Sequence, residues 1–236
     1  MIAIELVDRS QGRDFFSSMH LTYTQDTGQV KIESVNQGQE QGLQPVTPAL
    51  TLDFSRIASN FPDVVAWISL DNTAINYPVV QGDDNAFYLT HLPNGQEHKM
   101  GSIFMDYRNS PDFSDDNTLI YGHNMASGDM FAALNNYRNQ AFYEKHPTIK
   151  IKTPHNNYTL TLFAAYMIDS AVETVPINFD DSLTFRDYVA QAMYRSDFNA
   201  DVNVNDGSRL VTLVTCINTG APSYRYIVTG WLDTVD

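Results

Sequence analysis

From Val64 to Leu232 the chain is a succession of short runs rich in β-branched and aromatic residues, separated by polar turns. The run TIKIKT alternates apolar and polar residues, and the turn HNN leads from it into YTLTLFAAYMI, a pattern typical of a β-hairpin. The other strand-like runs are VVAWISL, INYPVV, NTLIYGH, RLVTLVTC and YRYIVTGWL. Because helical stretches interrupt these runs without a regular βαβ alternation, the sequence predicts a mostly antiparallel sheet closed into a barrel.

Peripheral helices are expected at three places. The segments GDMFAALNNY (128–137) and LTFRDYVAQAMYRS (183–196) have helical patterns, and Asp53 or Ser55 can cap a short helix that runs to about Asn60. The helix at 183–196 has an apolar stripe at helical spacing, made of Phe185, Tyr188, Val189, Ala192 and Met193. This stripe predicts that one face of the helix packs against the sheet.

Residues 1–50 differ in composition from the rest of the chain. Gly, Gln, Thr and Ser dominate 24–48, which contains few large apolar residues, so we expect an extended arm or linker preceded by a short helix around Ile4–Met19. The sequence therefore predicts two parts, an N-terminal arm or stalk at 1–50 and a compact domain at 51–236.

Composition excludes several classes of function. The 14 Lys and Arg against 28 Asp and Glu give a net charge of −14, which lacks the basic surface that nucleic-acid binding requires. An apolar fraction of 43% suffices for a core, while the longest apolar runs are too short for a membrane span and the charged N-terminus does not resemble a signal peptide. One cysteine excludes an internal disulfide and a Cys-rich zinc site.

The lone cysteine, Cys216, closes the strand-like run VTLVTC and precedes the polar stretch INTGAPS. A single cysteine is often a small buried apolar residue, but a thiol at a strand end beside a loop can be both held and accessible, as a nucleophile must be. Arg225 opens the next run, so the two side chains can lie at one rim of neighbouring strands. An arginine there can stabilise an oxyanion or lower the pKa of the thiol, or it can be an ordinary surface residue.

Among six histidines, His123 is the best candidate for a base, because it ends the buried run TLIYGH. A Cys–His couple needs the imidazole close to the sulfur, and sequence spacing cannot show that residues 93 positions apart meet. A metal site is not expected, since the sequence lacks paired metal-ligand motifs and an EF-hand loop.

At these residues the sequence resembles a sortase, most closely of class B. TLVTC matches the family's nucleophile strand, YGHNM matches the segment that carries its histidine, and RYIVTGWL is similar to its last strand, which begins with an arginine. The segments WISLDNTAINYPVVQGDDNAFYLTH, GSIFMDYRN and MFAALNNYRNQAFYEKHPTIKI between and before them are also close to class B sequences. The resemblance covers about Leu52 to Leu232 and rests on several motifs in the family's order.

The resemblance implies a mostly β fold with peripheral helices: a closed sortase barrel, mixed but largely antiparallel, with the helix at 183–196 in the long loop before the nucleophile strand. It implies a cysteine transpeptidase on the extracellular face of the cytoplasmic membrane of a Gram-positive bacterium, with any membrane anchor lying outside this chain. Cys216 would attack the threonine carbonyl of a C-terminal sorting signal and form a thioester, His123 would be the general acid/base, and Arg225 would steady the oxyanion and the substrate. The reaction would need no cofactor and no metal.

The resemblance also implies partners and a substrate groove. The partners would be surface proteins with an LPxTG-like or class-B-type sorting signal, and an amine acceptor from a cell-wall precursor or a pilin lysine. The groove residues would be Asn85, Leu89, Tyr121, Val214 and Thr215. Two features depart from the family: a valine stands at 214 where serine is frequent, and INTGAPSY replaces the usual acidic segment after the cysteine.

Two other functions remain open at this point. A cysteine protease would use the same Cys–His chemistry with water as the acceptor, and a surface barrel could bind peptides without catalysis.

Overall fold

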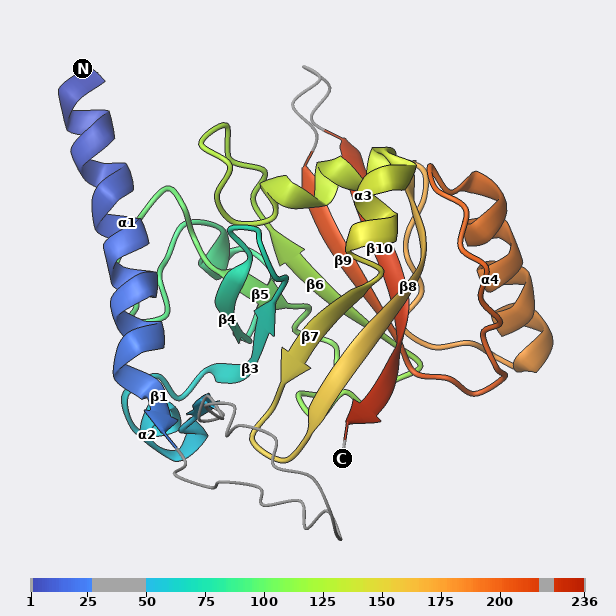
Figure 1. The fold of residues 1–236 in the computed structure, drawn as a ribbon, viewed down its shortest axis with the longest axis horizontal. Coiled ribbons are helices and arrows are strands. Elements are labelled where there is room, and N and C mark those ends of the chain that lie inside the picture. The colour runs from blue at the N-terminus through green and yellow to red at the C-terminus, as the bar shows by residue number, and fades with distance from the viewer. Residues whose placement is uncertain (1, 27–49, 217–222, 236) are drawn as a thin grey trace, which may run out of the picture.

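Eight strands form a closed β-barrel in the computed structural model, which describes residues 2–26, 50–216 and 223–235 (Figure 1). The order around the barrel is β10–β8–β7–β3–β4–β5–β6–β9. The strands are β3 (Val64–Ser69), β4 (Asn76–Val80), β5 (Ile103–Met105), β6 (Asn117–Gly122), β7 (Thr148–Lys152), β8 (Asn157–Asp169), β9 (Leu210–Cys216) and β10 (Tyr224–Val235). Closure depends on β10, which pairs with β8 on one side and with β9 on the other.

The barrel is mixed but largely antiparallel, which confirms the prediction from sequence. Only β4–β5 and β6–β9 are parallel among the described barrel pairs. The β6–β9 pair joins two strands that are far apart in the sequence. It brings the run NTLIYGH beside the run RLVTLVTC.

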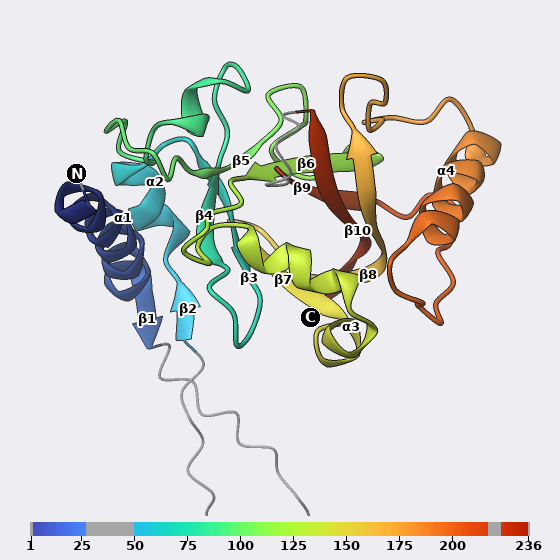
Figure 2. The ribbon, with the colours of Figure 1, turned by 90° about the horizontal axis from the view of Figure 1, so that it is seen from above.

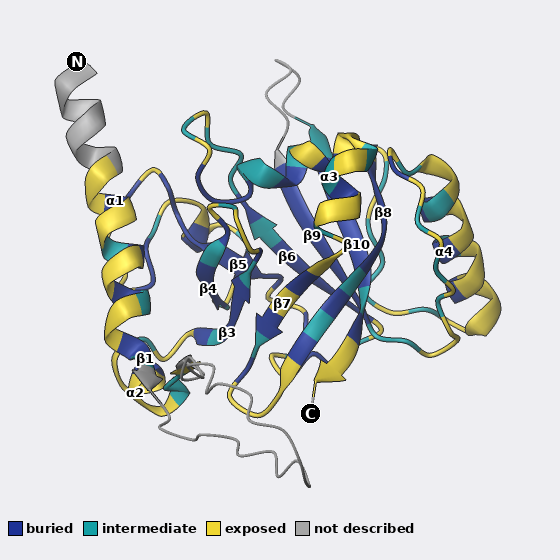
Figure 3. Ribbon diagram, viewed as in Figure 1, coloured by how far each residue is buried: buried dark blue, intermediate teal, exposed yellow. Residues whose placement is uncertain are grey.

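The core fills the barrel, and a second apolar layer lies outside β8, β9 and β10. Figure 3 shows that much of these three strands is buried. Leu213 of β9 belongs to the inner core, whereas its neighbour Val214 packs in the outer layer. That layer is covered by α4 (Ser182–Arg195), which buries Phe185, Val189 and Ala192 as its stripe predicted. Burial on both faces explains why β9 reads as an almost continuous apolar run rather than an alternating one.

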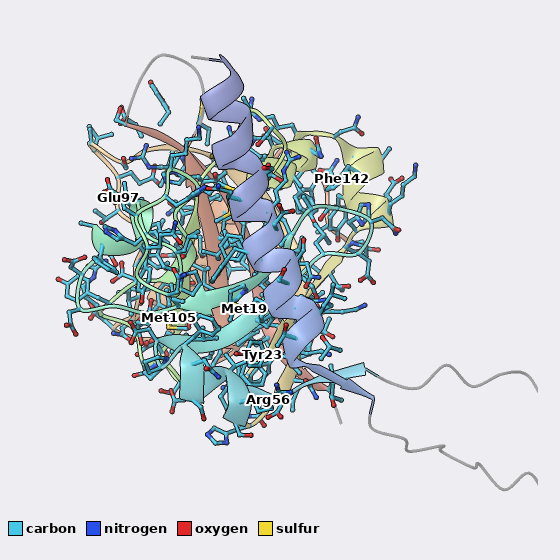
Figure 4. All side chains as sticks on the ribbon, turned by 90° about the vertical axis from the view of Figure 1, so that its left-hand side faces the viewer. Met19, Tyr23, Arg56, Glu97, Met105 and Phe142 are labelled. Atoms are coloured by element: carbon cyan, nitrogen blue, oxygen red, sulfur yellow. The ribbon has the colours of Figure 1, made fainter. Side chains whose placement is uncertain are left out.

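The N-terminal helix α1 (Ile2–Tyr23) lies on the side of the barrel opposite α4 (Figures 1 and 2). The helix expected around Ile4–Met19 falls within it. Phe16, Met19 and Tyr23 are buried against the domain, and Figure 4 shows the last two near the C-terminal end of α1. Among the residues that the structure describes, no helix combines the length and the apolar character needed to cross a membrane.

A short antiparallel pair follows α1. Strand β1 (Thr24–Asp26) pairs with β2 (Leu50–Leu52), and α2 (Phe54–Asn60) comes next, with the Asp53 side chain accepting a hydrogen bond from the backbone of Arg56. The extended arm expected at 24–48 lies mostly in 27–49, outside the described residues.

Short helical segments cover the rest of the barrel: η1 (Phe87–Leu89), η2 (Ala132–Arg138) and α3 (Gln140–Lys145). The prediction of a helix at 128–137 was wrong for its first turn, because η2 begins only at Ala132. Residues up to Phe131 form a turn instead, because Met130 has a φ of 56°, in the left-handed region that an α-helix cannot use.

Candidate active site

The strand register brings the three candidate catalytic residues into one row. In the parallel pair β6–β9, Gly122 lies opposite Thr215. His123 directly follows Gly122, and Cys216 directly follows Thr215. In the antiparallel pair β9–β10, Arg225 lies opposite Cys216. The backbones of His123, Cys216 and Arg225 therefore succeed one another across three neighbouring strands, while the Cys216 side chain is outside the described part of the chain.

The imidazole of His123 is held by a backbone carbonyl. Its Nε2 lies 2.7 Å from the carbonyl oxygen of Leu89, the last residue of η1. A carbonyl oxygen can only accept, so Nε2 carries the proton and Nδ1 is the proton-accepting nitrogen of the neutral ring. His123 is half-buried, so this hydrogen bond does not bury it completely.

Close packing fixes the backbone at His123. A Cβ atom at Gly122 would lie 2.4 Å from Cδ1 of Ile103 and 2.7 Å from Cδ2 of Phe131, so no side chain fits there. The backbone N–H of Phe131 donates to the carbonyl of His123 at 2.9 Å. The end of β6 is therefore held from both sides.

A groove of about 490 Å³ lies over the outer face of β6, β9 and β10. Tyr121, Val214 and Arg225 line its floor, and residues 173–177 of the β8–α4 connection line its wall. Arg225 is half-buried, and its Nη1 donates to the carbonyl of Tyr224. The groove therefore opens beside the row of candidate catalytic residues.

The wall of the groove is anchored by Asn117, which is fully buried. Its backbone N–H donates to the carbonyl of Ile177 at 2.8 Å, and its Nδ2 donates to the carbonyl of Pro176 at 2.8 Å. Because these are the last residues of the wall, one residue at the start of β6 fixes the β8–α4 connection against the barrel through its backbone and its side chain.

The predicted groove residues Asn85 and Tyr121 meet at a buried carboxylate, Asp106. Asn85 Nδ2 and the Tyr121 hydroxyl each donate to Asp106 Oδ2 at 3.0 Å. Arg108 completes the cluster, with Nε donating to Oδ1 at 2.9 Å and Nη2 donating to Oδ2 at 2.8 Å. Arg108 also lines the groove. Through Asn85, this cluster therefore links the floor of the groove to the segment that leads into η1.

Burial alone would raise the pKa of Asp106, but hydrogen bonds from Arg108, Asn85 and Tyr121 outweigh it and lower the pKa to about 2. Burial raises the pKa of Tyr121, and the adjacent Asp106 carboxylate raises it further. Asp106 is thus a fixed negative charge, and Tyr121 a fixed hydrogen-bond donor, across the neutral pH range. Sequence analysis missed Asp106 and Arg108 as site residues, although the segment GSIFMDYRN contains both.

The Asp106→Asn substitution is expected to lower the free energy of unfolding at pH 7 by roughly 1–3 kcal/mol relative to the wild type, because a buried charged acceptor is lost. The pKa of Asp106 is lower in the folded protein than in the unfolded chain, so its contribution is complete above about pH 5 and disappears as the pH falls through about 2. Urea unfolding at several pH values measures this difference between variant and wild type.

The exposed Asp71, which pairs with Lys150 at the surface, provides the matched control. Asp71→Asn is expected to change stability little, because exposed ion pairs contribute little. A stability gap for Asp106→Asn that stays constant down to pH 2 would contradict the assignment.

Two other predicted groove residues have different places. Leu89 is 39% exposed and contacts His123 through its backbone carbonyl. Thr215 is 1% exposed, it is not among the residues that line the groove, and its hydroxyl has no hydrogen-bond partner among the described residues. The structure therefore places Tyr121 and Val214 on the groove, Asn85 on the Asp106 carboxylate and the Leu89 carbonyl on the His123 ring, and it leaves the Thr215 side chain away from the groove. Among the described side chains, no group of three or more His, Cys, Asp or Glu is placed to hold a metal ion.

Comparison with known proteins agrees with this arrangement. A family model described as a sortase domain matches residues 68–233. Sortase B of Listeria monocytogenes is 31% identical over 215 residues, which are 91% of this chain and 82% of that protein.

Solved structures agree in fold. The crystal structure of sortase B from Bacillus anthracis in complex with AAEK1 aligns with a TM-score of 0.80 at 25% identity, over 98% of this chain and 100% of that one. The Staphylococcus aureus sortase B–substrate complex aligns with a TM-score of 0.73 at 33% identity, over 78% of this chain and 85% of that one. By sequence and by fold, the chain belongs to the sortase family of transpeptidases, as an enzyme of class B.

Proposed function

We propose that this sortase cleaves a C-terminal sorting signal after threonine and transfers the acyl group to an amine, with Cys216 as nucleophile. The observation that carries the proposal is the register that aligns His123, Cys216 and Arg225 across β6, β9 and β10, beside a groove. Two strands distant in sequence pair in this register, which supports a site built from all three residues.

In the first half of the reaction the Cys216 thiolate attacks the threonine carbonyl, and the C–N bond of the scissile peptide breaks. Protonated His123 donates a proton to the leaving amine, and a thioester remains on Cys216. In the second half the acceptor amine attacks the thioester, neutral His123 takes its proton, and the C–S bond breaks to restore the thiolate. The thioester keeps the acyl group activated, so one amide bond is exchanged for another without a cofactor.

Two neighbours support these roles. The Leu89 carbonyl holds Nε2–H of His123, so the neutral ring has Nδ1 available to accept a proton. The guanidinium of Arg225 borders the groove and can donate hydrogen bonds to the oxyanion of the tetrahedral intermediate. Tyr121 and Val214 line the groove and would contact the signal peptide, while Asn85 and Leu89 would act from its border and Thr215 through its backbone.

The substrates we propose are surface proteins with an LPxTG-like or class-B-type sorting signal, and the acceptor is an amine of a cell-wall precursor or a pilin lysine. The enzyme would then work on the extracellular face of the cytoplasmic membrane of a Gram-positive bacterium. We also propose 51–236 as the catalytic domain, with the region before it linking that domain to the membrane.

The test is ligation of a fluorescent sorting-signal peptide in the presence of an amine. Peptides of the LPxTG-like and class B types are each incubated with the enzyme and with either a glycine peptide or a lysine-bearing peptide, and products are separated by chromatography and mass spectrometry. We expect a ligated product that depends on the amine. Cleaved peptide alone, at a rate that added amine does not change, would identify a cysteine protease instead.

A further inference from the structure

Helix α1 is joined to the loop that follows His123 by a salt bridge. Arg13 Nε lies 2.9 Å and 2.8 Å from the two carboxylate oxygens of Asp129, and Arg13 Nη2 donates to the carbonyl of Ser127. The Arg13 side chain is 49% exposed, whereas that of Asp129 is 9% exposed. The contact thus connects the surface of α1 to a carboxylate buried in the loop.

That loop ends on His123 itself. Met130 pairs with Asn124 in an isolated β-bridge, and the next residue, Phe131, donates its backbone N–H to the carbonyl of His123. Ser127 donates its hydroxyl to Asp129, which fixes the carboxylate within the loop. Residues 124–131 therefore form a closed turn whose two ends hold the backbone at His123 and whose tip is bound to α1.

A second contact of α1 continues this connection through Tyr77 of β4. Its ring packs edge-to-face on Phe16 of α1 at a centroid distance of 5.1 Å, and its hydroxyl accepts the backbone N–H of Met130 at 3.1 Å. One turn of α1 therefore touches the loop after His123 both directly and through a buried tyrosine.

The same turn of α1 also contacts the segment that holds the His123 ring. A Cβ atom at Gly12 would lie 2.5 Å from Met100 Sδ and 2.6 Å from His98 Cε1, so the absence of a side chain lets α1 approach this segment closely. The segment is tied to η1, since His98 donates its backbone N–H to the carbonyl of Thr90 at 2.8 Å. Thr90 follows Leu89, whose carbonyl accepts the hydrogen bond from His123.

We propose that α1 is a positioning element for His123, acting through Gly12 and Arg13 on the two segments that hold its backbone and its ring. The inference rests on the proposed acid/base role of His123. Neither Gly12 nor Arg13 is among the residues that line the groove, so we expect neither to contact a peptide bound there. Docking of α1 then sets the rate of proton transfer without setting the affinity for the signal.

The test compares Arg13→Ala, Arg13→Lys and Gly12→Leu with the wild type in the ligation assay. We expect kcat to fall roughly ten-fold in Arg13→Ala and in Gly12→Leu, because small displacements of a catalytic group are costly, with KM for the sorting peptide unchanged. Arg13→Lys keeps the charge and should restore part of the loss. Lys150→Ala, which removes the exposed ion pair with Asp71, is the matched control and should leave kcat unchanged.

Two further measurements separate positioning from general destabilisation. The imidazole ¹⁵N and ¹H resonances of His123 should shift in Arg13→Ala and Gly12→Leu, while thermal unfolding of the barrel stays close to that of the wild type. The Arg13→Ala/Asp129→Ala double variant should lose no more activity than either single variant, because both remove the same contact.

Each failure points to a different conclusion. Unchanged kcat and unchanged His123 resonances in both α1 variants, with an inactive His123→Ala enzyme, would overturn the role of α1 and leave the proposed mechanism standing. Loss of kcat that only parallels loss of folded protein would also overturn it. A fully active His123→Ala enzyme would instead overturn the mechanism on which the inference rests.

Discussion

Replacement of Cys216 by alanine is expected to abolish both cleavage and ligation of the sorting peptide, a loss of at least about 10⁴-fold in kcat. The reason is that in the proposed mechanism every step after binding passes through a bond to the cysteine sulfur, and no other residue of the chain has a thiol. Turnover is measured by separating the labelled products, with circular dichroism showing that the variant keeps the wild-type fold.

Alkylation provides the control for this prediction, because the chain has a single thiol. Iodoacetamide should inactivate the native wild type in proportion to the incorporation of one label at Cys216, and a bound sorting peptide should slow the reaction. A thiol that reacts only after denaturation would identify Cys216 as a buried structural residue. Persistent turnover by Cys216→Ala would eliminate covalent catalysis at this position.

Replacement of His123 by alanine is expected to lower kcat by about 10²–10⁴-fold, the usual contribution of a positioned acid/base. In the proposed mechanism the variant loses both the donor for the leaving amine and the acceptor for the attacking amine, while the proposed peptide groove is kept. KM should therefore change much less than kcat. His123→Gln should behave in the same way, because an amide can accept a hydrogen bond but cannot exchange the proton.

The pH dependence distinguishes this role from a structural one. The wild type should show a bell-shaped dependence of kcat/KM on pH, and the residual activity of His123→Ala should lack the limb that the imidazole supplies. His155→Ala, at an exposed turn away from the groove, is the matched control and should keep the wild-type profile. Wild-type rates in His123→Ala would assign the base to another residue.

Much of the barrel was predictable because the residue pattern within each strand and turn indicates its local structure. The alternation in TIKIKT and the turn after it predicted the β7–β8 hairpin, and the Phe185 stripe predicted the packing of α4. Two features were not predictable in this way. The parallel pairing of β6 with β9 depends on contacts between distant segments, and the turn at 128–131 depends on the left-handed conformation of Met130, which its sequence does not indicate.

The candidate site likewise contains residues that could be predicted from the sequence and residues that could not. His123, Cys216 and Arg225 could be chosen from sequence because each stands at the end of a strand-like run, and the resemblance to a known family singled them out. Asp106 could not, since an aspartate after a short strand most often lies in a solvated turn. Its burial is evident only once Asn85, Arg108 and Tyr121 are brought around it by the fold.

The pairing of β10 with both β8 and β9 has a consequence for biosynthesis. A chain that has emerged only as far as its cysteine has neither the arginine nor a completed barrel, so acyl transfer must await the final strand. Until then β8 and β9 present unpaired edges on which a second chain can dock. Interruption of synthesis just short of the C-terminus would therefore yield an inactive species prone to self-association, and the onset of peptide ligation would report that the sheet has closed.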